Sequence, residues 1–421
     1  MSRSLLVRLL LVAAVSVFAP AKPTSAAPKA KPPGATVNEL TGLARQLSPE
    51  IAAAALAAEA ATARITSAGA LPGPTLRVDA DNLDNRNVSM NGPTTVFRLM
   101  QEFPLWGKLD LKRDMATFEA TASKYRSRGV DLDLVARIKG VFAARYATFR
   151  AYALTQQTLE TASNAAVTMR DRYTQAGATQ ADVFRLEIEA EELRIELERL
   201  RGQQAKTAAQ LNALLNRRPD AELAQPASLR RLPDEKTMRV AVLVARAVKL
   251  NPMIGEGQAK TASATAAQGL AERNRYPDVS LGVMTTRDRD GYAGSGVMGE
   301  LRIPLQWGAK QAEIAAAAAE RAAAEQKLST LKATVAGEVA GMLAEYQAAT
   351  KALTIMQQHH LPKSELVVES VLSALATGQG DAIGVLDAIR RLRNIQLDIL
   401  KMQVQLQASL AEIEKAIGGD L

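Results

Sequence analysis

The stretch QEFPLWGKLD, residues 101–110, returns in modified form as LRIPLQWGAKQ, residues 301–311. In both copies an apolar residue, a Pro and a Leu are followed by Trp-Gly and then by a Lys. Such an internal repeat decides the fold, because each half of the chain must then be explained as one structural unit. The repeat also extends well beyond these two stretches.

Residues 47–81 align with residues 250–284. Each copy opens with a Pro after Ser48 or Asn251, which is typical of a helix N-terminus. Alternation of apolar and polar residues, as at residues 76–80 and 279–283, then predicts a strand. A polar loop and a second alternating segment follow. Each half of the sequence is therefore predicted to form a helix, a strand, a loop, a second strand and, after the Trp-Gly pair, long helices.

The long helices carry coiled-coil patterns. Residues 109–173 contain no Pro, so about 60 residues could form a rod of about 90 Å at the α-helical rise. Spacings of three and four indicate a coiled-coil seam in the return arm and a similar seam in the last helix. The seams are Val183, Leu186, Ala190, Leu193, Leu197 and Leu200, then Val385, Ile389, Leu392, Ile399, Leu406, Leu410, Ile413 and Ile417. A second stripe of Phe184, Ile188 and Ile195 predicts another neighbour.

Two similar turns, at residues 172–187 and 374–392, join the long helices. We expect Gly177 and Gly378 to end helices in the left-handed conformation, which costs glycine nothing sterically. Thr179 and Asp381 are expected to cap the helices that follow.

The domain boundaries follow from composition. Residues 1–26 combine two Arg, a short apolar run and a small-residue exit, which is typical of a secretory signal peptide. The first repeat is predicted at 27–216, a Pro-spaced linker at 217–235 and the second repeat at 236–421.

Composition excludes several function classes. The 421 residues include no Cys, which excludes disulfides and thiolate metal sites. The formal net charge of +8 is diffuse, so we expect no nucleic-acid partner. Neither a catalytic triad nor a phosphate loop is present, and we predict no enzyme activity, no cofactor and no metal site. His359 and His360 are adjacent and precede Pro362, which favours a solvated turn at a helix end over a metal pair.

The four predicted strands are long enough to cross a bilayer when tilted. An open four-stranded sheet would expose unpaired backbone groups to lipid, at several kcal/mol each. Three copies of the chain would supply twelve strands and remove those edges. The predicted fold is therefore mainly α with a small β part. Tandem long helical hairpins would form a trimeric α-barrel, continued by a 12-stranded transmembrane β-barrel with four strands per protomer.

These features together resemble the outer membrane efflux protein family, the TolC-like outer-membrane factors. The resemblance covers residues 36–419. It rests on Ser48-Pro49 and Asn251-Pro252, on the two Trp-Gly stretches and on the two turns, in this order and duplicated. FPLWGK is most similar to the heavy-metal branch, the CzcC-like and CusC-like proteins.

The resemblance implies a homotrimer in the outer membrane, in contact with its lipid and with a large periplasmic part. It would work with a periplasmic adaptor and an inner-membrane pump of the RND type, and would export small molecules or metal ions. The adaptor-facing tip is implied at Arg172, Gly177, Thr179, Asp182, Gly378, Gly380 and Asp381. The barrel-to-helix junctions are implied at Pro104, Trp106, Gly107, Pro304, Trp307 and Gly308.

Other interpretations remain open from the sequence. The channel could serve type I protein secretion, and a structural periplasmic coiled-coil protein would explain the seams but not the strands. A secreted hydrolase would need a catalytic set of residues. Asp182 and Asp381 could form a cation-selective ring in a trimer, or could simply cap helices and compensate helix dipoles.

Overall fold

The computed structural model describes residues 32–81, 94–234, 237–287, 291 and 293–421. The predicted signal peptide and the predicted loop at 82–93 lie outside the described residues. The following paragraphs describe the body formed from residue 33 onward. Among its described residues, no helix has the length and apolar character needed to span a membrane.

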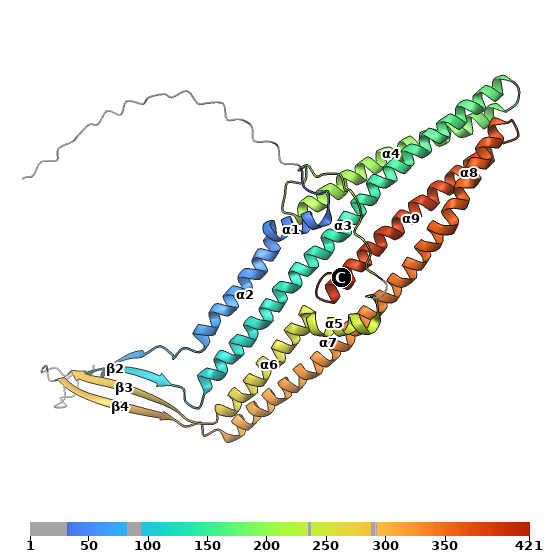
Figure 1. The fold of residues 1–421 in the computed structure, drawn as a ribbon. Helices are drawn as coiled ribbons and strands as arrows, with labels where there is room; N and C mark the ends of the chain where they lie inside the picture. Colours follow the sequence, from blue (N-terminus) through green and yellow to red (C-terminus); the bar gives the residue numbers. More distant parts are fainter. Residues whose placement is uncertain (1–31, 82–93, 235–236, 288–290, 292) are drawn as a thin grey trace, which may run out of the picture. The chain divides into compact units, whose positions relative to one another are not determined.

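The first half of the chain contains α1 (Val37–Leu47), α2 (Pro49–Ala68), β1 (Thr75–Asp81), β2 (Thr94–Phe103), α3 (Lys108–Thr174) and α4 (Gln180–Leu214). The second half contains α5 (Val240–Leu250), α6 (Pro252–Arg273), β3 (Asp278–Arg287), β4 (Ala293–Arg302), α7 (Trp307–Ile355), the π-helical turn η1 (Met356–His360), α8 (Leu361–Ala376) and α9 (Ala382–Ala416). The order helix, helix, strand, strand, long helical hairpin thus occurs twice (Figure 1).

The predicted helix starts are confirmed. The Ser48 hydroxyl accepts from the Ile51 N–H, and Pro49 is the first residue of α2. In the second half, the Asn251 side chain accepts from the Met253 and Ile254 N–H groups ahead of α6. In both cases the cap satisfies donors that the first helical turn leaves without intrahelical partners.

The long helices also form as predicted. α3 is one continuous helix of 67 residues, and it packs against α2, α4, α6 and α9. In α4 the seam residues Val183 to Leu197 are buried, and Leu200 is half-buried. The second stripe, represented by Ile188, is exposed. That stripe therefore has no covering neighbour among the described residues of a single chain.

The prediction of a helix end near Pro362 is wrong. The helical path continues from α7 through η1 into α8, and Pro362 lies in the first turn of α8. A π-turn is wider than an α-turn and forms i→i+5 bonds. The ring of Pro362 therefore follows a turn whose backbone hydrogen bonds have the i→i+5 spacing of a π-helix instead of the i→i+4 spacing of an α-helix. His359 and His360 are exposed, as predicted, but they lie on this π-turn and not in a loop.

The four strands form one antiparallel sheet in the order β1-β2-β3-β4. The registers place Leu76, Leu99, Val283 and Val297 in one row across the sheet. The adjacent row, whose side chains point to the opposite face of the sheet, contains Arg77, Arg98, Met284 and Gly296. The sheet is therefore amphipathic, with an apolar face and a largely polar one.

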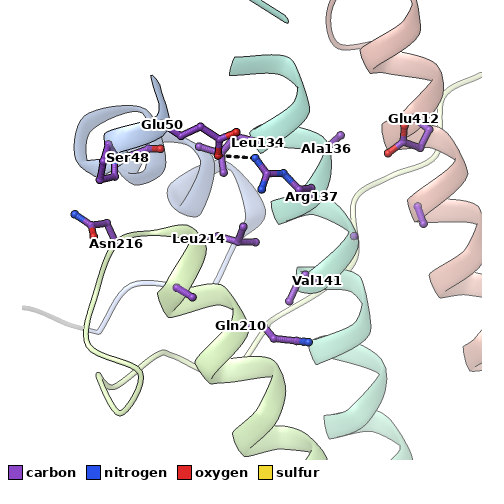
Figure 2. A pocket seen from close by; sticks show the side chains of 14 residues that line it. Ser48, Glu50, Leu134, Ala136, Arg137, Val141, Gln210, Leu214, Asn216 and Glu412 are labelled. Atoms are coloured by element: carbon purple, nitrogen blue, oxygen red, sulfur yellow. Dashed lines mark hydrogen bonds and ion pairs between the residues drawn. The ribbon is translucent and has the colours of Figure 1, made fainter. Parts of the chain in front are cut away.

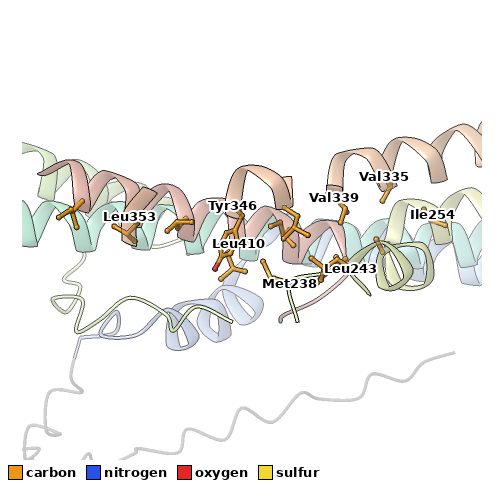
Figure 3. Packing of buried hydrophobic residues seen from close by; sticks show 14 residues of the cluster. Met238, Leu243, Ile254, Val335, Val339, Tyr346, Leu353 and Leu410 are labelled. Carbon is orange, nitrogen blue, oxygen red and sulfur yellow. The ribbon is translucent and has the colours of Figure 1, made fainter. Parts of the chain in front are cut away.

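The buried apolar residues form three clusters along the helices. The largest lies among α5, α6, α7 and α9 and includes Leu243, Val339, Tyr346 and Leu410, as Figure 3 shows. A second cluster lies near the ends of the two long hairpins, and a third joins α1 to α3 and α4. The predicted linker contains no helix or strand in its described part, and the N–H of Ala224 donates to the Pro33 carbonyl at 2.9 Å.

Candidate functional site: the two helical tips and the strand junctions

The first tip joins α3 to α4. Beyond the end of α3, the Gly177 N–H donates to the Arg172 carbonyl at 2.8 Å, and the Ala176 N–H donates to the Tyr173 carbonyl at 3.0 Å. This pair of bonds is a Schellman motif. Its left-handed residue is Ala176, with φ of +59°. The prediction that Gly177 takes this conformation is therefore wrong by one position, because the bond geometry requires the left-handed residue at Ala176.

The second tip joins α8 to α9 and repeats the motif. The Gln379 N–H donates to the Ala374 carbonyl at 2.9 Å, and the Gly378 N–H donates to the Leu375 carbonyl at 3.2 Å. Here the left-handed residue is Gly378, with φ of +84°, as predicted. Gly380 is required for space, since a Cβ atom there would lie 2.7 Å from the Leu375 nitrogen.

The predicted caps are confirmed. Thr179 caps α4 in a capping box, in which its hydroxyl accepts from the Asp182 N–H and the Asp182 carboxylate accepts from the Thr179 N–H. Asp381 caps α9 by accepting from the Gly384 N–H at 2.9 Å. Both carboxylates thus have local partners at helix N-termini, where negative charge is favoured.

Arg172 joins the two tips. Its guanidinium donates to the Gly177 carbonyl in its own tip at 3.1 Å, and to the Gly378 and Gly380 carbonyls of the other tip at 2.9 and 2.7 Å. All three acceptors are backbone oxygens of the turns that follow α3 and α8, which a fork of N–H donors can satisfy together. The structure therefore brings the predicted tip residues of both halves to one place.

Charged residues surround the tips. The Asp182 carboxylate also pairs with Arg185 at 2.8 Å. The hydrogen bond from the Thr179 hydroxyl, assisted by Arg185, holds the pKa of Asp182 below its ordinary value. Further from the turns, buried Glu189 on α4 pairs with Arg390 and Arg393 on α9. This pairing links the two hairpins a second time.

The first strand-to-helix junction is tightly bonded to the second half. Pro104 directly follows β2, and the turn uses left-handed conformations at Trp106 and Gly107, with φ of +65° and +73°. The Trp106 indole donates to the Pro277 carbonyl at 2.9 Å. Nearby, the buried ammonium of Lys108 donates to the Asp278 carboxylate at 2.8 Å.

The second junction differs from the first. Pro304 lies beyond the end of β4, but Trp307 is already the first residue of α7 and Gly308 lies inside that helix. Unlike Trp106-Gly107, the pair Trp307-Gly308 therefore forms no turn of its own between strand and helix. Trp307 is 64% exposed, and its neighbour Leu305 is 70% exposed.

The sequence did not predict a buried charged cluster between the two halves. The Glu414 carboxylate on α9 accepts from Lys139 on α3 at 2.7 Å, and from Arg230 of the linker at 2.8 and 2.7 Å. Lys139 also bonds to Asp420. Partners separated by about 180 to 280 residues share no local spacing, so no sequence pattern could have identified them.

One cavity of about 820 Å³ lies where α2, α3, α4 and α9 approach one another (Figure 2). Its charged lining includes Glu50 and Arg137, which pair at 2.7 Å, and Glu412. Asp133 pairs with Arg137 as well. Because its cation is already paired twice, we assign no ligand to this cavity.

Comparison with known proteins gives a family and a fold. The model of the family described as outer membrane efflux protein matches residues 40–217 and 243–419. No curated protein gave a match.

Several solved structures are similar. The outer membrane protein VceC from Vibrio cholerae superposes with a TM-score of 0.77 at 19% identity, over 91% of this chain and 96% of VceC. The MtrE outer membrane channel of Neisseria gonorrhoeae, solved in its open state, gives 0.74 at 18%, over 91% and 89%. CusC gives 0.78 at 17%, over 91% and 92%. At such identities the likeness shows a shared fold.

Proposed function

Because the chain belongs to the outer membrane efflux protein family, we propose that it forms the outer-membrane channel of a tripartite efflux system. In this proposal three copies close their sheets into a twelve-stranded barrel in the outer membrane. Their helices continue as an α-helical barrel through the periplasm. The tunnel is passive, and transport is driven by an inner-membrane pump of the RND type through a periplasmic adaptor.

The observation that carries this proposal is the amphipathic sheet. Large apolar side chains stand exposed along its apolar face, with Leu76 at 65% and Val297 at 86% exposure. Burying such a row from water is favourable at about 25 cal/mol per Å². β1 and β4 are edge strands within the described sheet, and lipid cannot satisfy an open edge. Pairing β4 of one copy with β1 of the next would satisfy both edges.

The helices support the same assembly. Phe184 and Ile188 of α4 are exposed on one flank. On the other half, Leu366 and Val367 of α8 and Ile383 of α9 are exposed. A ring of copies would place such flanks against one another. A structural coiled-coil protein would leave the apolar face of the sheet uncovered.

We place the adaptor-docking end at the two tips. Both turns end long helices, and Arg172 holds their backbones together. A partner would then meet one combined surface instead of two separate loops. The trimeric symmetry would present this surface three times. We also propose that residues 1–26 are removed on export, and that 27–216 and 236–421 act as the two repeats around the linker at 217–235.

Edge pairing can be tested by cysteine cross-linking, because the native chain contains no Cys. One protein would carry Val78→Cys on β1, and the other a single Cys placed in turn along β4 from residue 294 to residue 301. Mixed before assembly in lipid, the two should form disulfide-linked dimers at one register. In the matched control, the β4 variants are mixed with a protein that carries Glu59→Cys, on the exposed face of α2, in place of Val78→Cys.

Two further measurements test the channel itself. The purified protein in detergent should have the mass of three chains, and in planar bilayers it should conduct ions. A stable monomer that gives no conductance would overturn the proposal. A deletion strain should become sensitive to metals or small toxic molecules. Loss of an extracellular protein instead would favour the alternative of type I secretion.

A further inference from the structure

Methionine is concentrated on the polar face of the sheet. The chain has 12 Met, and Met100, Met284 and Met298 lie on three adjacent strands of this one small sheet. The strand registers place all three on the face that carries Arg77 and Arg98. An apolar core does not explain them, because Val96 is the only other large apolar residue of the described strands on this face, and the remaining ones are on the opposite face.

The register brings the three side chains together. Met100 of β2 and Met298 of β4 are both paired with Gly282 of β3, so they flank it from two sides. A Cβ atom at Gly282 would lie 2.9 Å from the Met100 Cγ and 3.2 Å from the Met298 Cγ. Both side chains therefore lean over the space that this glycine leaves.

Met284 occupies the next row. It is paired with Gly296 of β4, and a Cβ atom at Gly296 would lie 3.0 Å from the Met284 methyl carbon. Gly282 precedes Met284 by two residues on the same face of β3. The two glycines thus leave open two neighbouring positions, over which the three methionine side chains lie. All three remain partly exposed, which leaves them reachable from water.

The charges around this cluster do not repel a cation strongly. Arg98, which is paired with Met284 across the sheet, forms an ion pair with Asp79. Arg302 forms an ion pair with Glu102 at 3.2 Å. Glu300 lies on the same face of β4, two residues from Met298. Asp79 also pairs with Arg77 on this face. The cations Arg77, Arg98 and Arg302 are thus balanced by three carboxylates, Asp79, Glu102 and Glu300.

We propose that Met100, Met284 and Met298 form a binding site for a soft monovalent metal cation, Cu(I) or Ag(I). Thioether sulfur is a soft, neutral ligand that selects such ions over Zn(II) or Mg(II). The binding itself does not depend on the channel role. If the proposed function holds, the polar face of the sheet lines the lumen, and the site lies on the path of the exported solute.

The simpler alternative is that these methionines only fill gaps above the glycines, as flexible thioethers often do. The two explanations differ in what a leucine does. Leucine has a similar volume and would fill the gaps, but it has no sulfur to offer a metal. A triple substitution, M100L/M284L/M298L, therefore separates packing from ligation.

The test measures Ag(I) bound to the full-length protein purified in detergent, by titration calorimetry in chloride-free buffer. The native protein should bind Ag(I), and Zn(II) should not compete. In the triple variant the affinity should fall by about tenfold or more, since even indirect changes around a metal site have that effect. Affinity should be unchanged between about pH 7 and pH 5, because a thioether has no proton to release.

A matched control is the double variant M253L/M342L, which removes thioethers outside the sheet and should bind Ag(I) as the native protein does. Ion conductance of the triple variant checks that it still assembles, and X-ray absorption of the native complex should show sulfur neighbours. Equal Ag(I) binding by the native protein and a conducting triple variant would overturn the site, with the channel proposal unaffected. If M253L/M342L lost as much affinity for Ag(I) as the triple variant, the proposed site would also be overturned. If the triple variant does not conduct, X-ray absorption of the native Ag(I) complex decides the question. A spectrum that shows no sulfur neighbours of the metal would overturn the site.

Discussion

The guanidinium of Arg172, in the last turn of α3, donates to the carbonyl oxygen of Gly380 at 2.7 Å, although the two residues belong to different halves of the chain. Its other contacts are the Gly177 and Gly378 carbonyls. One side chain thus bonds both turns. Its removal should loosen the second tip as much as the first, because the acceptors lie in both.

Arg172→Ala is expected to lower the local free energy of opening of both tips by about 1.5–3 kcal/mol, the range for hydrogen bonds of a charged group. Hydrogen exchange of residues 175–181 and 377–384 measures it directly. Arg170→Ala is the matched control, because exposed Arg170 pairs with Glu187 inside the first hairpin only. Faster exchange confined to the first tip would refute the joining role of Arg172.

The left-handed residue is an alanine in the first tip and a glycine in the second. Substitutions at the two positions should therefore have opposite effects. Ala176 has φ of +59° and Gly378 has φ of +84°, a region where an L side chain costs about 1 kcal/mol. Ala176→Gly should therefore stabilise the first turn, and Gly378→Ala should destabilise the second, each changing amide protection about fivefold.

Protection of the Gly177 and Gln379 amides, which close the two Schellman bonds, gives the measurement. Gly177→Ala is the control. Its φ lies outside the left-handed region, and a Cβ atom would meet the Arg172 carbonyl oxygen at 3.5 Å, an ordinary contact. If Gly177→Ala lowered amide protection as much as Gly378→Ala does, Ala176 would not be the left-handed residue of the first tip.

The capping box at the start of α4 should depend on pH. The Thr179 hydrogen bond, with help from Arg185, lowers the pKa of the Asp182 carboxyl below 3.8. A lowered carboxyl pKa means that the folded tip favours the charged form. Its stabilising effect is therefore complete above the ordinary pKa and is lost as the pH falls through the lowered one.

We expect the protection factor of the Asp182 amide, which donates to the Thr179 hydroxyl, to stay constant down to about pH 5 and to fall in more acidic solution. Asp182→Asn cannot titrate and should give a flat profile at lower protection. Asp381→Asn at the other tip leaves this box intact and should reproduce the native curve. A fall that persists in Asp182→Asn would assign the effect to another group.

The sequence allowed prediction of the features that depend on local spacing. The seam through Leu186 and Leu193, the caps at Ser48 and Thr179 and the two tips each need only a few neighbouring residues. The π-turn before Pro362 was missed because proline usually ends a helix, and only the wider turn makes room for it. The left-handed Ala176 was missed because glycine is the usual residue there.

The contacts between the halves could not be predicted. Arg172 reaches carbonyl oxygens 206 and 208 residues away, and backbone oxygens carry no sequence signature. The same holds for Lys108 and Asp278, which meet only once α3 and β3 are placed side by side. Pairing across the repeat depends on the packing of whole helices, and a single sequence contains no direct record of it.

The buried cluster around Glu414 provides the sharpest test of that packing. Glu414 is 3% exposed and Lys139 is 6% exposed. Glu414→Gln removes the carboxylate shared by Lys139 and Arg230, and should cost about 3–5 kcal/mol, as expected when one partner of a buried ion pair is lost. Lys139→Met should cost less, because Glu414 keeps both of its bonds to Arg230. Denaturant unfolding of the purified protein gives the comparison.

The matched control lies two residues away on the same helix. Glu412 is exposed and pairs with Lys415 at 3.3 Å, so Glu412→Gln should change the free energy of unfolding by no more than about 0.5 kcal/mol. The order of costs, Glu414 above Lys139 above Glu412, follows from the ion pairs that each variant breaks. Glu414→Gln breaks the pairs with both Lys139 and Arg230, Lys139→Met breaks one of these two, and Glu412→Gln breaks only an exposed pair. If Lys139→Met proved as costly as Glu414→Gln, Arg230 would not be compensating the carboxylate, and the cluster would act as a simple pair.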